Sequence, residues 1–170
     1  MSLIRFVSLA ILSTAALGHV DARAASADAT MARAEGEVLH ADDVDAIRDL
    51  AEGYGAARVV ELDNGDPAIV GEINGTDYQL FFLECDNGEN CGALNFYAVW
   101  DVPTVSVGAL NVWNRTAPFN KAYLTEQNRP VIEMNLPAKG GFQREQLDYV
   151  FEQWTIALAE FARTVIGGAP

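Results

Sequence analysis

Few residues of this chain combine the types and the spacing that covalent chemistry requires. Beyond residue 24 there is one histidine, His40, and there are two serines, Ser26 and Ser106. A serine nucleophile needs a base within hydrogen-bonding reach. Ser106 stands where a helix N-cap is expected, and His40 directly precedes another expected helix start. The sequence therefore predicts no catalytic residues and a protein that is not an enzyme.

Oxygen-donor side chains crowd the one loop that holds the two cysteines, where calcium binding is the hypothesis to weigh. They are Glu84, Asp86, Asn87, Glu89 and Asn90. Their order lacks the glycine at the sixth position and the distal glutamate of an EF-hand loop. With one histidine, a catalytic zinc site would have to be built from carboxylates. We therefore expect a hydrated turn here, and neither a metal nor a cofactor in the protein.

A pair of carboxylates is the arrangement that glycoside hydrolysis needs. Asp101 and Glu133 are the least arbitrary pair, because both are expected on strands near the middle helix. Each is more readily explained as facing solvent or a cation, either Arg115 or Lys121. A carboxylate-dependent hydrolase is therefore the least favoured of the functional hypotheses.

The segment from 105 to 137 carries the side chains best suited to hold a ligand or a partner. The candidate contacts are Asn111, Trp113, Asn114 and Arg115, on an expected short helix. Amides do not titrate, so they suit binding and not proton transfer. The alternative is that Asn111 and Asn114 bond to neighbouring backbone and end the helix. Large aromatics at strand and helix spacing are expected in the core, as for Trp100, Trp113, Phe119, Tyr123 and Trp154.

The first 24 residues have the pattern of a signal peptide. Arg5 precedes an apolar run over 6–17 that is too short to span a bilayer, and Ala22-Arg23-Ala24 gives a small-x-small cleavage site. Cleavage after Gly18 is the alternative. Residues 25–37 are expected to be a flexible leader, and residues 38–167 a single domain. The predicted location is periplasmic or secreted, with no membrane span in the mature chain.

Charge and cysteine content narrow the partners and the compartment. The formal net charge of the full chain is −13, from 24 acidic and 11 basic residues. Nucleic acid and anionic lipid are bound through clustered Lys and Arg, so neither is an expected partner. Solubility is the simplest explanation of the acid excess. Cys85 and Cys91 are the two cysteines, and in an exported protein they predict one disulfide.

The elements that position these residues are amphipathic helices and antiparallel strands. A helix is expected from Asp42 or Asp43, then strands over 58–62, 68–73, 78–84 and 93–102, with Asn64-Gly65 and Asn74-Gly75 as hairpin turns. The next expected elements are a helix to about 114, strands over 119–125 and 131–136, and a last helix over 143–166. The predicted fold class is α+β, an antiparallel sheet of about six strands covered by three helices in the order α-β-β-β-β-α-β-β-α.

These pieces in this order resemble the YbjN-domain family, whose fold is similar to that of type III secretion chaperones. The matching segments are 74–75, 85–96, 110–115, 119–123, 140–141 and 154–161. The resemblance implies a non-catalytic domain with a sensory or regulatory role and chaperone-like dimers. It supplies no catalytic residue and no established ligand. An exported, disulfide-containing form departs from the cytosolic relatives, so a cytosolic regulatory role is not expected here.

Together these observations predict an exported, non-enzymatic binding or chaperone-like domain of YbjN type. It would act through contacts with a protein partner or through self-association. The alternative is a small-ligand sensor, with a pocket between the middle helix and the sheet near Asn111, Trp113 and Asn114.

Overall fold

The structure is a computed structural model that describes residues 36–102 and 105–167. The signal peptide predicted for residues 1–24 and most of the predicted leader lie outside the described residues. The elements are β1 (Val38–Leu39), α2 (Val44–Glu52), β2 (Ala56–Glu61), β3 (Pro67–Ile73), β4 (Thr76–Leu83), β5 (Ala93–Val99), α3 (Val107–Thr116), β6 (Lys121–Leu124), β7 (Pro130–Pro137), β8 (Phe142–Gln143), α4 (Arg144–Phe161) and a π-helical turn, η1 (Ala162–Ile166).

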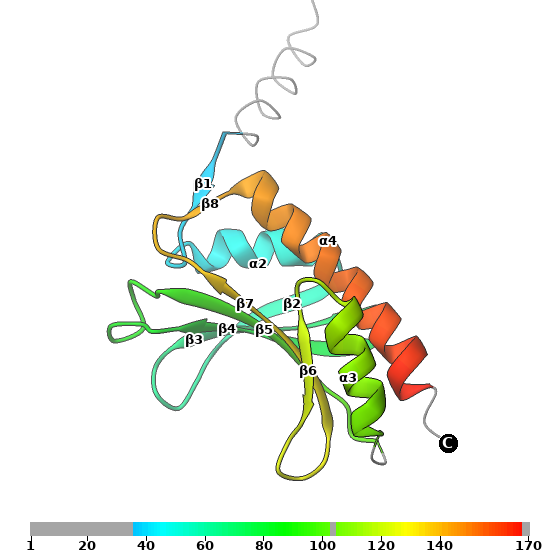
Figure 1. The fold of residues 1–170 in the computed structure, drawn as a ribbon. Coiled ribbons are helices and arrows are strands. Elements are labelled where there is room, and N and C mark those ends of the chain that lie inside the picture. The colour runs from blue at the N-terminus through cyan, green and yellow to red at the C-terminus, as the bar shows by residue number, and fades with distance from the viewer. Residues whose placement is uncertain (1–35, 103–104, 168–170) are drawn as a thin grey trace, which may run out of the picture.

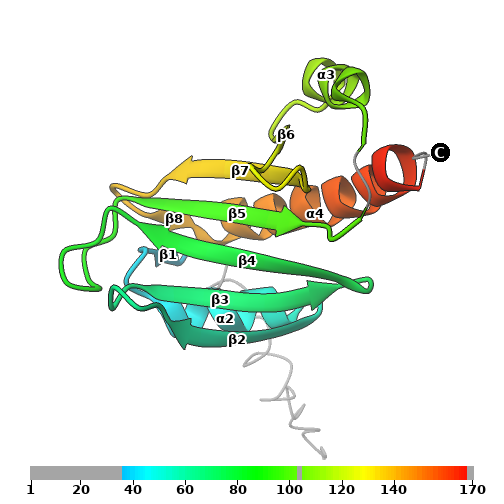
Figure 2. The same cartoon turned by 90° about the horizontal axis from the view of Figure 1, so that it is seen from below.

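The main sheet has six antiparallel strands in the order β2-β3-β4-β5-β7-β6. Helices α2 and α4 lie across one face of this sheet, and α3 stands beside β6 at one edge (Figure 1). Figure 2 looks onto the opposite face, which no helix of the described chain covers. The α+β fold predicted from the sequence is confirmed.

The two Asn-Gly pairs both mark hairpins, but their turns differ. Asn74 and Gly75 have φ of 52° and 77°, so both central positions are left-handed, as a type I′ turn requires. At the first hairpin only Gly65 has positive φ, at 83°. There the loop is longer, because the N–H of Leu62 donates to the carbonyl of Asp66 across three intervening residues. The prediction of a turn was therefore right at both places, and the two-residue geometry holds only at the second.

The core lies between the helices and the covered face of the sheet. Strand β5 places Leu94, Phe96 and Ala98 on this face, and all three are buried. The Phe96 ring meets Phe151 at 5.0 Å and Trp154 at 5.6 Å, measured between ring centroids. Edge-to-face and tilted contacts of this kind add to the burial of apolar area. The alternation that the sequence predicted for β5 therefore fixes which face of the sheet α4 covers.

Helix α4 carries the longest apolar stripe of the chain. Its buried residues recur at helical spacing and comprise Leu147, Phe151, Trp154, Ala157, Leu158 and Phe161. Tyr54, just after α2, stacks on Phe151 and donates its hydroxyl to the Asp148 carboxylate at 2.7 Å. The stripe thereby joins both helices to one core, and Phe161 extends that core toward α3.

A two-stranded ribbon of β1 and β8 precedes α4 and was not predicted. Val38 pairs with Gln143 and Leu39 with Phe142. The N–H of Arg144 donates to the carbonyl of Glu37, and the two side chains form an ion pair at 3.4 Å. Strands of two residues are too short to show a period-2 pattern, so they could not be predicted from the sequence.

Cys85 and Cys91 form the predicted disulfide, in the loop that joins β4 to β5. The loop turns sharply, since Glu84, Asn87 and Asn90 all have φ between 52° and 56°. The N–H of Gly92 donates to the carbonyl of Leu83 at 2.9 Å and closes the ladder at the base of the loop. The disulfide therefore clamps the register of two central strands.

Candidate binding site

Ser106 is the N-cap of helix α3, as the sequence predicts. The Ser106 side chain accepts a hydrogen bond from the Ala109 N–H at 3.1 Å, which satisfies one free donor of the first turn. The apolar residues Leu110 and Trp113 are buried and attach the helix to the rest of the core. The Trp113 ring meets Phe161 at 5.0 Å between centroids, in an edge-to-face contact. Ser106 therefore has an architectural role.

Asn114 attaches α3 to the edge strand β6. Its side-chain amide donates to the Ala122 carbonyl at 2.9 Å and accepts from the Ala122 N–H at 2.7 Å. Both bonds replace those that a neighbouring strand would make with Ala122, which lies in a strand at the sheet edge. The backbone-bonding alternative that the sequence offered for Asn114 matches this geometry, and its amide is fully engaged.

Trp113 is held by a residue that the sequence reasoning missed. Its indole N–H donates to the Asn120 side-chain oxygen at 2.7 Å, in a buried contact. Asn120 is only 6% exposed and is one of two buried polar residues in the described part of the chain, with Asn95. A lone asparagine after Pro118 and Phe119 resembles any loop residue, so the sequence carried no signal for this role.

Asn111 and Arg115, the other two predicted contacts, are both exposed on the outer side of α3. Within the described part of the chain, neither side chain forms a hydrogen bond or an ion pair. The structure thus separates the four residues into an engaged pair, the buried Trp113 and the half-buried Asn114, and an exposed pair without described partners, Asn111 and Arg115.

A cavity of about 270 Å³ opens between the C-terminal end of α3 and the outer side of α4. Its walls include Trp113, Ala117, Phe119, Asn120, Ile156 and Glu160. Phe119 and Ile156 are 55% and 50% exposed, a high fraction for large apolar side chains. The pocket predicted from the sequence was placed between the middle helix and the sheet near Asn111 and Asn114, neither of which lines this cavity.

A second and larger concavity lies on the open face of the sheet. Its volume is about 420 Å³, and its lining includes Arg58, Val70, Glu72, Asp77, Gln79 and Tyr97. These residues come from the first four strands of the sheet order. Phe81 lies beside them and meets Tyr97 edge-to-face at 6.0 Å between ring centroids. The open face therefore combines half-buried aromatic rings with charged side chains.

The titrating groups with displaced pKa values are mainly tyrosines. Burial raises the pKa of Tyr97 on the open face. At the adjoining edge, burial and a hydrogen bond to the Glu133 carboxylate raise the pKa of Tyr123 to about 12. Burial alone raises the pKa of Tyr78 to about 12, and its hydroxyl has no described partner. All three phenols are therefore neutral at physiological pH and suit contact, not proton transfer.

The carboxylates weighed for hydrolysis do not gather into a site. Glu133 lies opposite Tyr97 in the β5–β7 register and accepts from the Tyr123 hydroxyl at 3.1 Å. Asp101 was expected on a strand, but β5 ends at Val99, so Asp101 lies in the segment that follows the strand. No hydrogen bond of the described residues involves the Asp101 side chain, whereas the Glu133 carboxylate is engaged with Tyr123.

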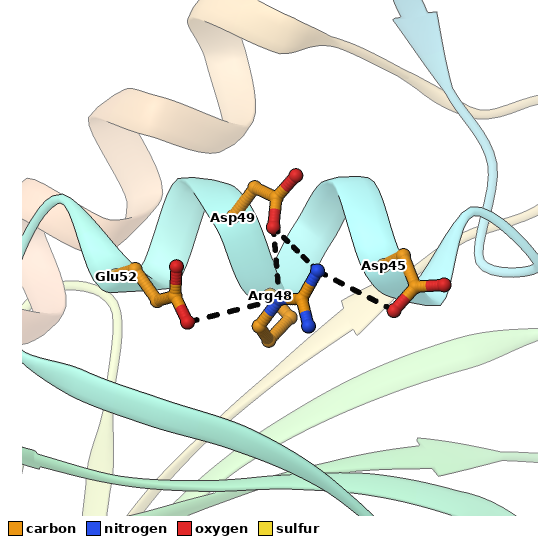
Figure 3. A network of polar contacts seen from close by, with 4 residues as sticks. All are labelled: Asp45, Arg48, Asp49 and Glu52. Carbon is orange, nitrogen blue, oxygen red and sulfur yellow. Dashed lines mark hydrogen bonds and ion pairs between the residues drawn. The ribbon is translucent and has the colours of Figure 1, made fainter.

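Acidic residues also gather on α2, around one arginine. Arg48 pairs with Asp49 at 2.6 Å, Asp45 at 3.5 Å and Glu52 at 3.9 Å (Figure 3). The hydrogen bond to Asp49 is the main cause that raises the pKa of Arg48. All three carboxylates are exposed, and exposed ion pairs stabilise a helix only slightly. This cluster is therefore a solvated helix surface.

Within 36–102 and 105–167, no group of three or more His, Cys, Asp or Glu side chains is placed to hold a metal ion. The loop acids considered for calcium form no such group. Among the described helices, none has the length and apolar character needed to cross a membrane.

Comparisons with known proteins identify relatives of the chain. A family profile named YbjN, described as "Putative bacterial sensory transduction regulator", matches residues 43–167. The crystal structure of YbjN, "a putative transcription regulator from E. coli", aligns with a TM-score of 0.49 at 16% sequence identity, covering 76% of this chain and 98% of that chain. No curated protein matches this chain.

Proposed function

This chain belongs to the YbjN family, and we propose that it is an exported, non-enzymatic regulatory domain that binds a basic protein partner through the open face of its sheet. The observation that carries the proposal is the difference between the two faces of that sheet. One face is sealed by α2 and α4, and the other presents a concavity of about 420 Å³ with aromatic walls.

The open face has the composition of a protein-binding surface. Tyrosine and phenylalanine are enriched at the centres of protein interfaces, where they add contact area at low entropic cost. Here Tyr97 and Phe81 contact each other, and Val70 and Val99 lie half-buried beside them. Glu72 and Asp77 line the same concavity and supply a polar rim. An apolar centre with a charged rim is the usual anatomy of a specific interface.

The charge of the molecule favours a basic partner. The net charge of −13 repels a second copy of the chain and attracts a cationic surface, which increases the rate of association. On the concavity itself, two carboxylates, Glu72 and Asp77, are set against the single guanidinium of Arg58. A partner segment with Lys or Arg around an apolar residue therefore fits the face better than an acidic one.

The disulfide supports the compartment that this proposal assumes. Disulfides persist in oxidising environments such as the periplasm and the exterior. The bond between Cys85 and Cys91 is compatible with such a compartment. The signal-peptide pattern of residues 1–24 independently predicts export to it.

A site-specific photo-crosslinker tests the proposal directly. p-Benzoylphenylalanine replaces Tyr97 on the open face in one variant, and in the control it replaces Tyr149, which is 52% exposed on α4. Irradiation of cells should give an adduct with one basic protein at position 97 and none at position 149. Equal adducts at both positions, no adduct at position 97, or an adduct of twice the mass of the chain would each overturn the proposal.

A further inference from the structure

We propose that the cavity between α3 and α4 is a binding site for a small neutral aromatic molecule that carries a carbonyl oxygen. This site is separate from the open face, because no residue lines both cavities. Its volume of about 270 Å³ is close to the lower end of the range for small-molecule pockets, which is roughly 300–1,000 Å³.

The chemistry of the site follows from one hydrogen bond. The indole N–H of Trp113 can only donate, so the Asn120 atom that faces it at 2.7 Å must be the oxygen. The orientation of the Asn120 amide is therefore fixed, and its NH₂ group points away from the indole. Among the hydrogen bonds of the described residues, the Asn120 side chain takes part only through its oxygen, and its nitrogen is not among the fully buried atoms that lack a partner.

Asn120 therefore brings an unused donor to a largely apolar cavity, whose other polar lining residues are Thr116, Gln153 and Glu160. The residue is 94% buried, from an exposed fraction of 6%, and it lines the cavity. Solvent reaches this NH₂ group through the cavity that Asn120 lines, so the group is open to an acceptor that enters there. A ligand oxygen that accepts from the Asn120 NH₂ group takes the place of water on this donor. The donor thus defines the acceptor that a ligand must carry.

The walls define the rest of the ligand. Trp113 and Phe119 present aromatic surface, and Ile156 and Ala117 present aliphatic surface. Planar rings bury a large area against such walls. Phe119 and Ile156 are about half exposed, so a ligand that covers them gains further apolar burial.

Charge selects a neutral ligand over an anion. Glu160 is the one carboxylate that lines the cavity, and Arg163 pairs with it at 3.0 Å, so the guanidinium is already engaged. A ligand carboxylate would therefore meet no free cation there and would approach a protein of net charge −13. An amide or ketone oxygen accepts the same hydrogen bond without that penalty.

Two naphthalene probes of the same ring and similar size, one with a neutral amide and one with a carboxylate, test the site. The indole N–H signals of the ¹⁵N-labelled protein are followed during titration with 2-naphthamide and with 2-naphthoate. 2-Naphthamide should shift the indole N–H signal of Trp113 more than those of Trp100 and Trp154. The Trp113 signal is identified by its loss in Trp113→Phe. The carboxylate should bind at least about tenfold more weakly.

Asn120→Asp isolates the proposed donor. The aspartate keeps an oxygen for the Trp113 indole but has no NH₂ group, so the Trp113 signal should persist while the affinity for 2-naphthamide falls at least about tenfold. Asn111→Asp on the exposed side of α3 is the control and should bind as the wild type does.

Ile156→Ala provides a second variant that cannot be explained by loss of folding, because its side chain is half exposed on α4. It should weaken binding of 2-naphthamide several-fold. An unshifted Trp113 signal at saturating 2-naphthamide, equal affinity for 2-naphthoate, or unchanged affinity in Asn120→Asp would each overturn the assignment.

Discussion

The two faces of the main sheet are built from alternate residues of the same strands, yet they have different surroundings. On β4 and β5 the covered face carries Leu80, Phe82 and Phe96, all fully buried under the helices. The open face carries Phe81 and Tyr97, which are only half-buried. Both faces are rich in large apolar side chains, but only one has a partner within the described chain. The comparison separates residues that stabilise the fold from residues that are free to bind.

The largest expected effect comes from two phenylalanines on neighbouring strands. Phe96→Ala should cost about 3–5 kcal/mol in the free energy of unfolding, because the ring contacts Phe151 and Trp154 and leaves a cavity. Phe81→Ala, on the open face, should cost no more than about 1.5 kcal/mol, because the ring is only half-buried. Urea titration followed by circular dichroism measures both. Equal losses would remove the distinction between the faces.

The disulfide acts on both faces at once, because it joins β4 to β5. Replacing both Cys85 and Cys91 by serine should lower the free energy of unfolding by about 2 kcal/mol, the chain-entropy value for so short a loop. Denaturant titration with and without dithiothreitol measures this effect. The reductant should destabilise the wild type and leave the double variant unchanged. If complete reduction left the free energy of unfolding of the wild type unchanged, the role assigned to the disulfide would be contradicted.

The α3 edge offers a matched pair of asparagines. Asn114→Ala removes two hydrogen bonds to Ala122 and should destabilise the protein by about 1–2 kcal/mol. Asn111→Ala, three residues earlier and exposed, should change stability by less than about 0.5 kcal/mol. Thermal unfolding of both variants provides the measurement. Similar values for the two would mean that Asn114 does not fasten α3 to β6.

The smallest expected effect concerns Tyr78 and the dependence of stability on pH. Its hydroxyl is buried without a partner, so Tyr78→Phe should stabilise the protein by about 1 kcal/mol at pH 7. Its pKa is raised to about 12, above the value of about 10 in an unfolded chain. The contribution of Tyr78 to stability is therefore constant below pH 10 and falls between pH 10 and pH 12, where only the unfolded chain releases the proton.

Comparing pH 8 with pH 11 by urea titration measures this dependence. The decline should be smaller in Tyr78→Phe than in the wild type. Some decline should remain, because Tyr54 and Tyr123 also have raised pKa values. A variant with the full wild-type decline would show that Tyr78 does not contribute to it.

The fold was predictable where the physical signal is local and repeated. The Asn74-Gly75 turn, the alternation in β5 and the apolar stripe of α4 each specify their element through short-range patterns. The ribbon of β1 and β8 has two residues per strand, which no pattern can reveal. The order of strands within the sheet is likewise a product of long-range pairing, as where β7 lies between β5 and β6.

The candidate sites were predicted less completely. Asn114 was recognised as a residue that either binds or bonds to backbone, and its bonds to Ala122 show the second. Asn120 could not be found, because its role depends on Trp113 meeting it from a different element. The concavity on the open face depends on which side chains from four strands stand next to each other. Only the register supplies that information, and the register is not local.

The most direct test of the division between the two faces is the affinity of this chain for the partner protein that the crosslinker at position 97 identifies. Isothermal titration should show that Tyr97→Ala weakens binding at least about tenfold, because an aromatic side chain at the centre of an interface contributes most of the energy. Tyr149→Ala on α4 should leave the dissociation constant within about twofold of the wild type. Loss of affinity in Tyr149→Ala, with Tyr97→Ala unaffected, would contradict the account.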